Sequence, residues 1–192
     1  MERDFTKTLQ AYMEAERRAY EDLPLADVNA VMNVLETARL AGQRIFICGN
    51  GGSAATASHF VCDFDKGVSH GLTQEQKYDF VCLSDNVPTM MAVANDVSYD
   101  EVFRVPLMNK MRAGDVVIGI SGSGNSENVV RALAYANEHG GVTVAITGYD
   151  GGRMKQIAQH SIHVPVDNMQ IAEDLHMVLD HMMMWTLVED GK

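Results

Sequence analysis

Two short segments rich in glycine and serine could bind a phosphate group without any basic side chain. The first is Gly49-Asn50-Gly51-Gly52-Ser53, and the second is Ser121-Gly122-Ser123-Gly124-Asn125-Ser126. Each follows a short apolar run and precedes a stretch with helical spacing, so backbone N–H groups and hydroxyls gather at a helix N-terminus. Ser126 is also a favourable N-cap residue. The two segments predict a phosphate site, and the alternative is that both are ordinary turns between a strand and a helix.

Nucleotide-binding motifs explain these segments less well. The chain has no GK[ST] sequence, which excludes a P-loop. Residues 49–54 match G-x-G-x-x-A, but that fingerprint needs an acidic residue about 20 positions later. The candidate, Asp85, lies about 30 positions after the motif. A dinucleotide site would also leave the second serine segment unexplained.

Histidine and carboxylate residues at helical spacing could bind a metal or transfer protons. His59 and Asp63 are four residues apart, which puts both on one face of a helix and within reach of one cation. Glu173 and His181 are eight residues apart, about 12 Å of helix, so their spacing is less convincing. His176 and Asp180 form a competing pair four residues apart on the same helix. The alternative is that these residues are solvated or hydrogen-bonded on amphipathic helices.

The elements that must position these residues alternate between strands and helices. Apolar runs predict strands at 45–48, 78–83, 115–120, 142–147 and 161–166, and helical spacing predicts helices at 3–20, 25–40, 53–64, 88–94, 99–111, 126–139, 150–159 and 169–189. This order predicts an α/β fold with a five-stranded parallel sheet covered by helices, preceded by two N-terminal helices. Ligands of such sheets bind at the carboxyl ends of the strands, where both serine segments lie.

Composition limits the class of protein. The 192 residues fit one domain, and a net charge of −11 disfavours nucleic acid as a partner. The longest uncharged stretch, 45–62, contains the first glycine segment, which argues against a membrane span. No apolar run follows the N-terminus, so no signal peptide is expected. Cys48, Cys62 and Cys82 show no CxxC pairing, which favours reduced thiols and a cytoplasmic location.

Taken together, the motifs resemble SIS (sugar isomerase) domains. Over nearly the whole chain they are similar to the bacterial phosphoheptose isomerase family, in segments 48–55, 94–96, 119–126, 147–152 and 173–176 and at His181. The resemblance implies a single SIS domain over 1–192. It also implies an isomerase that interconverts sedoheptulose 7-phosphate and D-glycero-D-manno-heptose 7-phosphate through an enediol. It further implies a homotetramer, with the helices in 3–41 at a subunit interface.

The resemblance also implies roles for individual residues. The expected substrate-binding residues are Asn50, Gly51, Gly52, Ser53, Asn95, Asp96, Ser121, Gly122, Ser123, Ser126 and Glu173. A zinc ion is expected on His59, Asp63, Glu173 and His181. His181 would move protons on the sugar oxygens and Asp63 at carbon, with Glu173 as the alternative base. Asp63 stands where the family has Glu, and Glu173 stands where it has Gln.

Two non-catalytic alternatives remain open from the sequence. An initiator-associating protein that binds the replication initiator DnaA has this fold, shares the look of residues 147–152 and resembles a scaffold. A phosphosugar-sensing regulator is the other alternative, but no helix-turn-helix remains outside the SIS domain. A binding module has no need of His59, Asp63 and His181, so these residues favour the enzyme.

Overall fold

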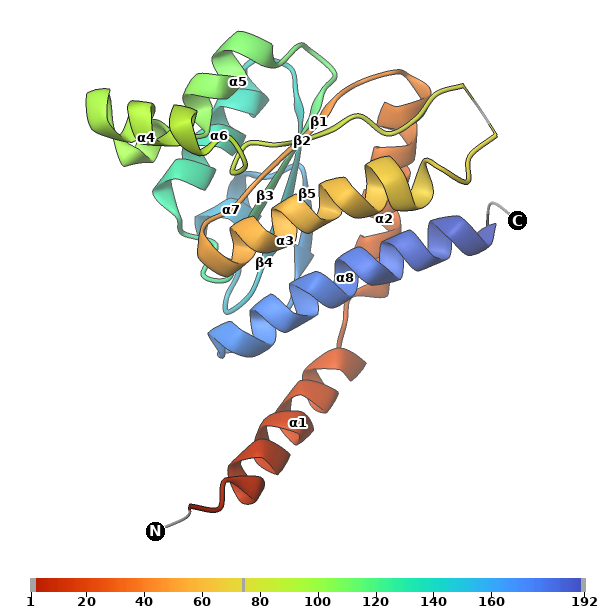
Figure 1. The fold of residues 1–192 in the computed structure, drawn as a ribbon, viewed down its shortest axis with the longest axis vertical. Coiled ribbons are helices and arrows are strands. Elements are labelled where there is room, and N and C mark those ends of the chain that lie inside the picture. The colour runs from red at the N-terminus through yellow and green to blue at the C-terminus, as the bar shows by residue number, and fades with distance from the viewer. Residues whose placement is uncertain (1–2, 74, 191–192) are drawn as a thin grey trace.

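A parallel five-stranded sheet forms the centre of the computed structural model, which describes residues 3–73 and 75–190 (Figure 1). The strands lie in the order β2-β1-β3-β4-β5. Their bounds are β1 Ile45–Cys48, β2 Phe80–Cys82, β3 Val116–Ser121, β4 Val142–Thr147 and β5 His160–His163. Every pairing is parallel; Ile47 of β1, for example, lies between Cys82 of β2 and Ile118 of β3. The predicted α/β fold is confirmed.

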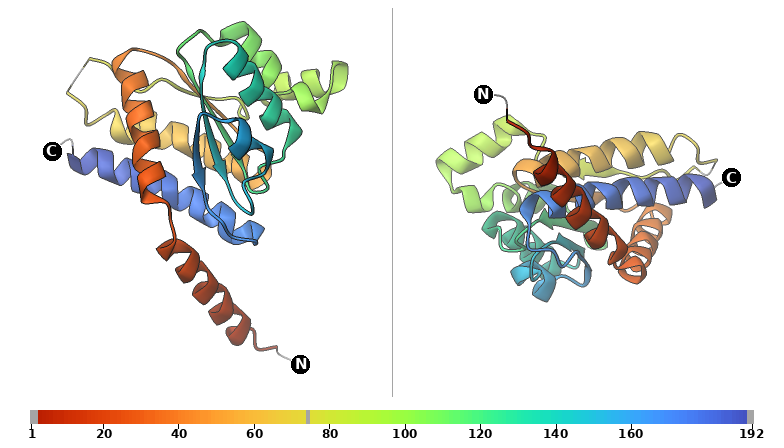
Figure 2. Two further views of the ribbon diagram at one scale, coloured as in Figure 1. Left: turned by 180° about the vertical axis from the view of Figure 1, so that it is seen from behind. Right: turned by 90° about the horizontal axis from the view of Figure 1, so that it is seen from below.

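Helices cover both faces of the sheet, as Figure 2 shows from two further sides. α2 (Leu25–Leu40), α3 (Gly51–Val61) and α8 (Met169–Asp190) pack on one face around a core that includes Leu35, Phe64 and Leu179. On the other face, α5 (Arg104–Lys110), α6 (Glu127–Glu138) and α7 (Gly152–Ile157) enclose Phe103 and Leu133. Coverage on both faces explains why β1 and β3 are continuous apolar runs.

The N-terminal helix α1 (Thr6–Glu21) extends away from the body of the molecule (Figures 1 and 2). None of its residues is buried, and Leu9 and Met13 expose well over half of their surface. A hydrogen bond from the Tyr12 hydroxyl to the Asp174 carboxylate connects α1 to α8. The chain therefore presents an apolar helix face that this single copy does not cover.

Two predicted helices differ from those observed. The helix predicted at 53–64 is α3, and it continues as a π-helix over Cys62–Val68. The helix predicted at 99–111 divides into a 3₁₀ turn, Tyr99–Glu101, and α5. Pro106 is the third residue of α5, where no intrahelical N–H bond is needed, so the break lies before the proline rather than at it.

The remaining boundaries are shifted by a few residues at most. The short helix predicted at 88–94 is α4 (Val87–Asp96), and the predicted strands at 78–83 and 161–166 are shorter in the structure. Among the described residues, no helix is both long enough and apolar enough to cross a bilayer.

Candidate active site

The serine segments meet in one cavity at the carboxyl ends of β1 and β3. These strands are neighbours, so the turns that follow them lie side by side. The cavity holds about 170 Å³. Its lining residues are Asn50, Ser53, Ile120, Ser121, Gly122, Ser123, Ser126, Met169 and Glu173. We call this the serine cavity. It brings together all four serines predicted to bind phosphate.

The hydroxyls of the second segment point toward one another. The Ser121 Oγ lies 3.1 Å from the Ser126 Oγ and 3.5 Å from the Ser123 Oγ. Ser126 occupies the N-cap position of α6, as predicted, but its side chain makes no cap hydrogen bond. Its hydroxyl therefore remains directed at the serine cavity, beside the positive end of α6.

Asn50 holds the two turns together. Its side chain exchanges a pair of 2.9 Å hydrogen bonds with Asn128, and the Tyr99 hydroxyl donates to the Asn50 Oδ1 at 2.8 Å. Sequence reasoning assigned Asn50 to the substrate and missed both partners. Asn128 gave one signal that could have revealed it, because an amide in the first turn of an otherwise apolar helix face must find a partner when buried.

Four predicted substrate residues do not line the serine cavity. Asn95 and Asp96 end α4, are exposed, and share a hydrogen bond of 2.7 Å from the Asn95 amide to the Asp96 Oδ1. Gly51 and Gly52 are exposed at the start of α3. Their role toward a sugar remains a prediction.

Glu173 lies in the serine cavity and not with the predicted metal ligands. A Cβ atom on Gly52 would lie 2.4 Å from the Glu173 Oε2, so the carboxylate rests directly against the first glycine segment. Because Glu173 precedes His181 by two helical turns, its side chain reaches the serine cavity instead of the histidine.

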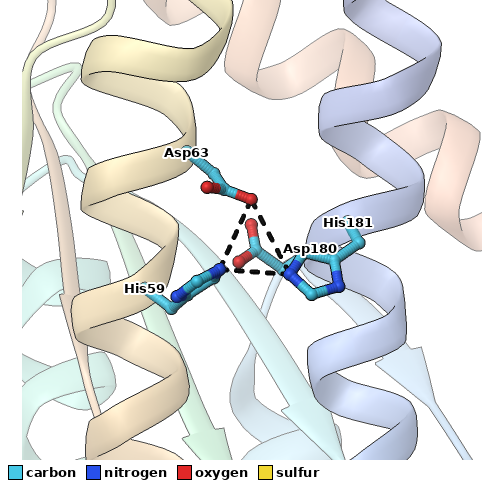
Figure 3. A group of neighbouring side chains, drawn as sticks. All are labelled: His59, Asp63, Asp180 and His181. Atoms are coloured by element: carbon cyan, nitrogen blue, oxygen red, sulfur yellow. Dashed lines mark hydrogen bonds and ion pairs between the residues drawn. The ribbon is translucent and has the colours of Figure 1, made fainter.

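A second group of side chains lies farther along the contact between α3 and α8 (Figure 3). His59 and Asp63 come from α3 and its π-helical continuation, and Asp180 and His181 come from α8. One ligand atom from each residue lies within 4.8 Å of those from the other three. We call these four residues the histidine–aspartate cluster. The structure thus brings together three of the four predicted zinc ligands, with Asp180 in place of Glu173.

The geometry of the cluster is close. The Nε2 atoms of His59 and His181 are 3.1 Å apart, and the Asp63 Oδ2 lies 3.6 Å from the first and 3.9 Å from the second. The His59 side chain is 41% exposed, which leaves the cluster open to solvent on one side, while the Asp63 side chain is 13% exposed. Two imidazole nitrogens and a carboxylate that converge in this way form a donor set typical of zinc.

Asp180 is the member of the cluster that sequence reasoning missed. Its side chain is fully buried, and neither carboxylate oxygen has a hydrogen-bond partner among the described residues. Burial raises the pKa of the Asp180 carboxyl to about 8, and the Asp63 carboxylate adds to the increase. The sequence signal is its four-residue spacing from His176, which pairs Asp180 with that histidine and not with His181.

Comparison with known proteins identifies the family. A family model described as "SIS domain" matches residues 9–148. A "Probable phosphoheptose isomerase" of Thermoplasma acidophilum is 34% identical over 89% of this chain and 92% of the relative. A "Phosphoheptose isomerase" of Helicobacter pylori is 33% identical over 92% of this chain and 90% of the relative.

A solved structure agrees with these relatives. Phosphoheptose isomerase GmhA from Neisseria gonorrhoeae superimposes with a TM-score of 0.87 at 28% identity, covering 96% of this chain and 98% of that one. The sequence-based recognition is confirmed: the chain belongs to the SIS domain family, within which its relatives are phosphoheptose isomerases.

Proposed function

We propose that this chain is an aldose–ketose isomerase that converts sedoheptulose 7-phosphate to D-glycero-D-manno-heptose 7-phosphate. The observation that carries the proposal is the pairing of two sites on one helix. α8 contributes Glu173 to the serine cavity and His181 to the histidine–aspartate cluster. Eight residues of helix separate them, about 12 Å along its axis. This separation suits a long sugar phosphate whose phosphate and carbonyl ends are bound at different places.

The serine cavity would hold the phosphate end. Ser53, Ser121, Ser123 and Ser126 supply hydroxyls, and the N-termini of α3 and α6 supply backbone N–H groups and a favourable dipole. Gly52 and Gly122 let the backbone approach, since a Cβ there would contact Glu173 and Met169. Gly51, Asn95 and Asp96 would contact the sugar chain. Fixing the far end of the substrate orients the reacting carbons.

The histidine–aspartate cluster would move the protons. A carboxylate removes the proton next to the carbonyl, and a histidine moves the proton between the two sugar oxygens of the enediol. We assign the oxygens to His181 and the carbon to Asp63. Glu173, the alternative base expected from the sequence, lies in the serine cavity at the phosphate end. His59, Asp63 and His181 would hold a zinc ion, which supplies polarisation of the sugar carbonyl when bound.

The uncovered face of α1 supports an oligomer. We propose a cytoplasmic homotetramer in which the helices of residues 3–41 lie at a subunit interface. Phe5, Leu9 and Met13 recur every four residues and are all more than half exposed, as expected for a face that another subunit covers. Light scattering coupled to size-exclusion chromatography measures the mass directly.

The decisive experiment is isomerisation of sedoheptulose 7-phosphate in deuterated solvent. The wild type should convert the sugar and exchange deuterium into it, whereas His181→Ala should react about 10²–10⁴-fold more slowly. His139→Ala, at an exposed histidine bonded to the Tyr135 carbonyl, is the matched control. A wild type that catalyses neither conversion nor exchange would overturn the enzyme and leave the non-catalytic scaffold.

Phosphate binding is tested separately by calorimetric titration. Ser123→Ala should weaken sugar phosphate binding about tenfold, because a hydrogen bond to a charged group contributes about 1.5–3 kcal/mol. Ser58→Ala, on α3 but bonded to Asp85 outside the serine cavity, should bind as the wild type does. Equal affinity in the two variants would contradict the phosphate assignment.

A further inference from the structure

We propose that Asp180 is the fourth metal ligand of this chain and that Glu173 is not a ligand. The inference rests on the proposed metal at His59, Asp63 and His181, and it concerns which carboxylate completes that set. Asp180 directly precedes His181, so both leave α8 within 1.5 Å of helix rise. Figure 3 shows both side chains directed from α8 toward α3, where His59 and Asp63 meet them.

The surroundings of Asp180 call for a cation. The side chain is fully buried and its two oxygens have no hydrogen-bond partner within the described part of the chain. An isolated carboxylate in such a place is costly, and the nearby Asp63 carboxylate increases the cost through repulsion. A divalent ion between the two aspartates would neutralise both. The two histidines add neutral nitrogen donors and complete a set of four.

Two other polar residues of α8, His176 and Glu173, do not take this role. His176, one turn earlier, is buried as well, but both of its ring nitrogens lack hydrogen-bond partners among the described residues, so it does not pair with Asp180. Glu173 is occupied at the other end of the site, with its carboxylate against Gly52. Asp180 is therefore the carboxylate directed at the histidines, and Glu173 is the one in the serine cavity.

The short side chain of Asp63 explains why a second carboxylate, that of Asp180, would be needed at the metal. Aspartate is one methylene shorter than glutamate, and its Oδ2 stays 3.6 Å and 3.9 Å from the two histidine nitrogens. A carboxylate on the opposite helix closes the set from the other side. The two helices thereby contribute one histidine and one aspartate each, which makes the proposed site symmetrical between α3 and α8.

The test is zinc binding to metal-stripped protein without any sugar. Zinc is titrated in competition with a chelator into the wild type, Asp180→Asn, Glu173→Gln and Asp174→Asn. Asp180→Asn should weaken zinc binding by at least about tenfold. Loss of a residue that only hydrogen-bonds a metal ligand already lowers metal affinity about 10–100-fold. Glu173→Gln should bind as the wild type does. Asp174→Asn, an exposed aspartate of α8 bonded to Tyr12, is the matched control.

Two further measurements test whether Asp180 binds the metal. Zinc should raise the unfolding temperature of the wild type far more than that of Asp180→Asn or Asp180→Leu, and both variants should be at least as stable as the wild type without metal. Substitution with cobalt(II) should give a visible spectrum that changes with Asp180→Asn and not with Glu173→Gln. Unchanged zinc affinity in Asp180→Asn, or a loss confined to Glu173→Gln, would overturn the assignment. Neither result depends on whether the chain isomerises a sugar.

Discussion

His176 should make the stability of this protein strongly dependent on acid. Its imidazole is fully buried in α8, and neither ring nitrogen forms a hydrogen bond of normal geometry with the described residues. Burial lowers the pKa of His176 to about 4, and the Thr147 backbone opposes this effect only in part. The histidine is therefore neutral in the folded protein at neutral pH.

The magnitude follows from the difference between the folded and unfolded states. Above pH 6.5, the ordinary pKa of a histidine in an unfolded chain, the imidazole is neutral in both states and its stabilising contribution is fully present. As the pH falls from 6.5 toward 4, the unfolded chain binds a proton that the folded protein does not. The free energy of unfolding then decreases by about 1.4 kcal/mol per pH unit, about 3 kcal/mol in all.

The perturbation is His176→Leu, which keeps the site apolar and removes the titrating group. Urea unfolding is followed by circular dichroism between about pH 7.5 and about pH 4.5, with a chelator present so that metal binding does not contribute. The wild type should lose about 3 kcal/mol more than the variant over this range. Met183→Leu, a fully buried and non-titrating position of the same helix, should follow the wild type. Equal acid dependence in His176→Leu and Met183→Leu would refute the argument.

Three other substitutions test the architecture by urea unfolding at neutral pH. Ser126→Ala should lower the free energy of unfolding by less than the ~1 kcal/mol usual for an N-cap serine, because its hydroxyl makes no cap hydrogen bond. Phosphate binding measured by calorimetry should weaken. A loss of stability as large as that of an ordinary N-cap would contradict this. Gly124→Ala should destabilise the protein by at least about 2 kcal/mol, since the φ of Gly124 is +66° and a Cβ would lie 2.1 Å from the Gly151 carbonyl oxygen. An unchanged free energy of unfolding would show that the turn can rearrange. Arg104 and Arg131 hold the pKa of the buried Glu101 below its usual range. Glu101→Gln should therefore lower the free energy of unfolding by about 1–3 kcal/mol at neutral pH, and by less in acid, where the wild-type side chain is itself protonated and neutral. A loss independent of pH would contradict this.

The sheet and the serine cavity were predictable because their signals are local in the chain. β1 and β3 are continuous apolar runs that end in glycine or serine, and parallel strands place such ends at one edge of the sheet. Once those strands are neighbours, Ser53 and Ser121 must lie close together. The division of the helix predicted at 99–111 was not predictable in this way. It involves the Ser98 hydroxyl, which accepts from the Asp100 N–H, and Glu101, which is held by Arg131 from α6.

The fourth member of the histidine–aspartate cluster shows what spacing along one helix cannot reveal. Spacing rules group residues by the face they share, and on that basis Asp180 belongs with His176, four residues away. Asp180 and His181 point about 100° apart around α8, so a single helix gives no reason to join them. The contact between two packed helices does, because side chains on either side of the contact line converge toward the opposite helix. Only the packing of α8 against α3 decides this.

The same packing links the two ends of the proposed substrate. α8 places Glu173 beside the first glycine segment and His181 beside His59, and α3 runs from that segment to His59. The positions of Glu173 and His181 relative to α3 are therefore both fixed by the packing of α3 and α8, without an intervening loop. A sliding of α8 along α3 would carry Glu173 out of the serine cavity and separate Asp180 from Asp63 in a single movement. The buried residues Leu175 and Leu179, which lie between these two ends of α8, oppose such sliding through their contacts with the core. The contact between α3 and α8 therefore sets both the packing of this part of the core and the separation between the phosphate site and the proton-transfer groups.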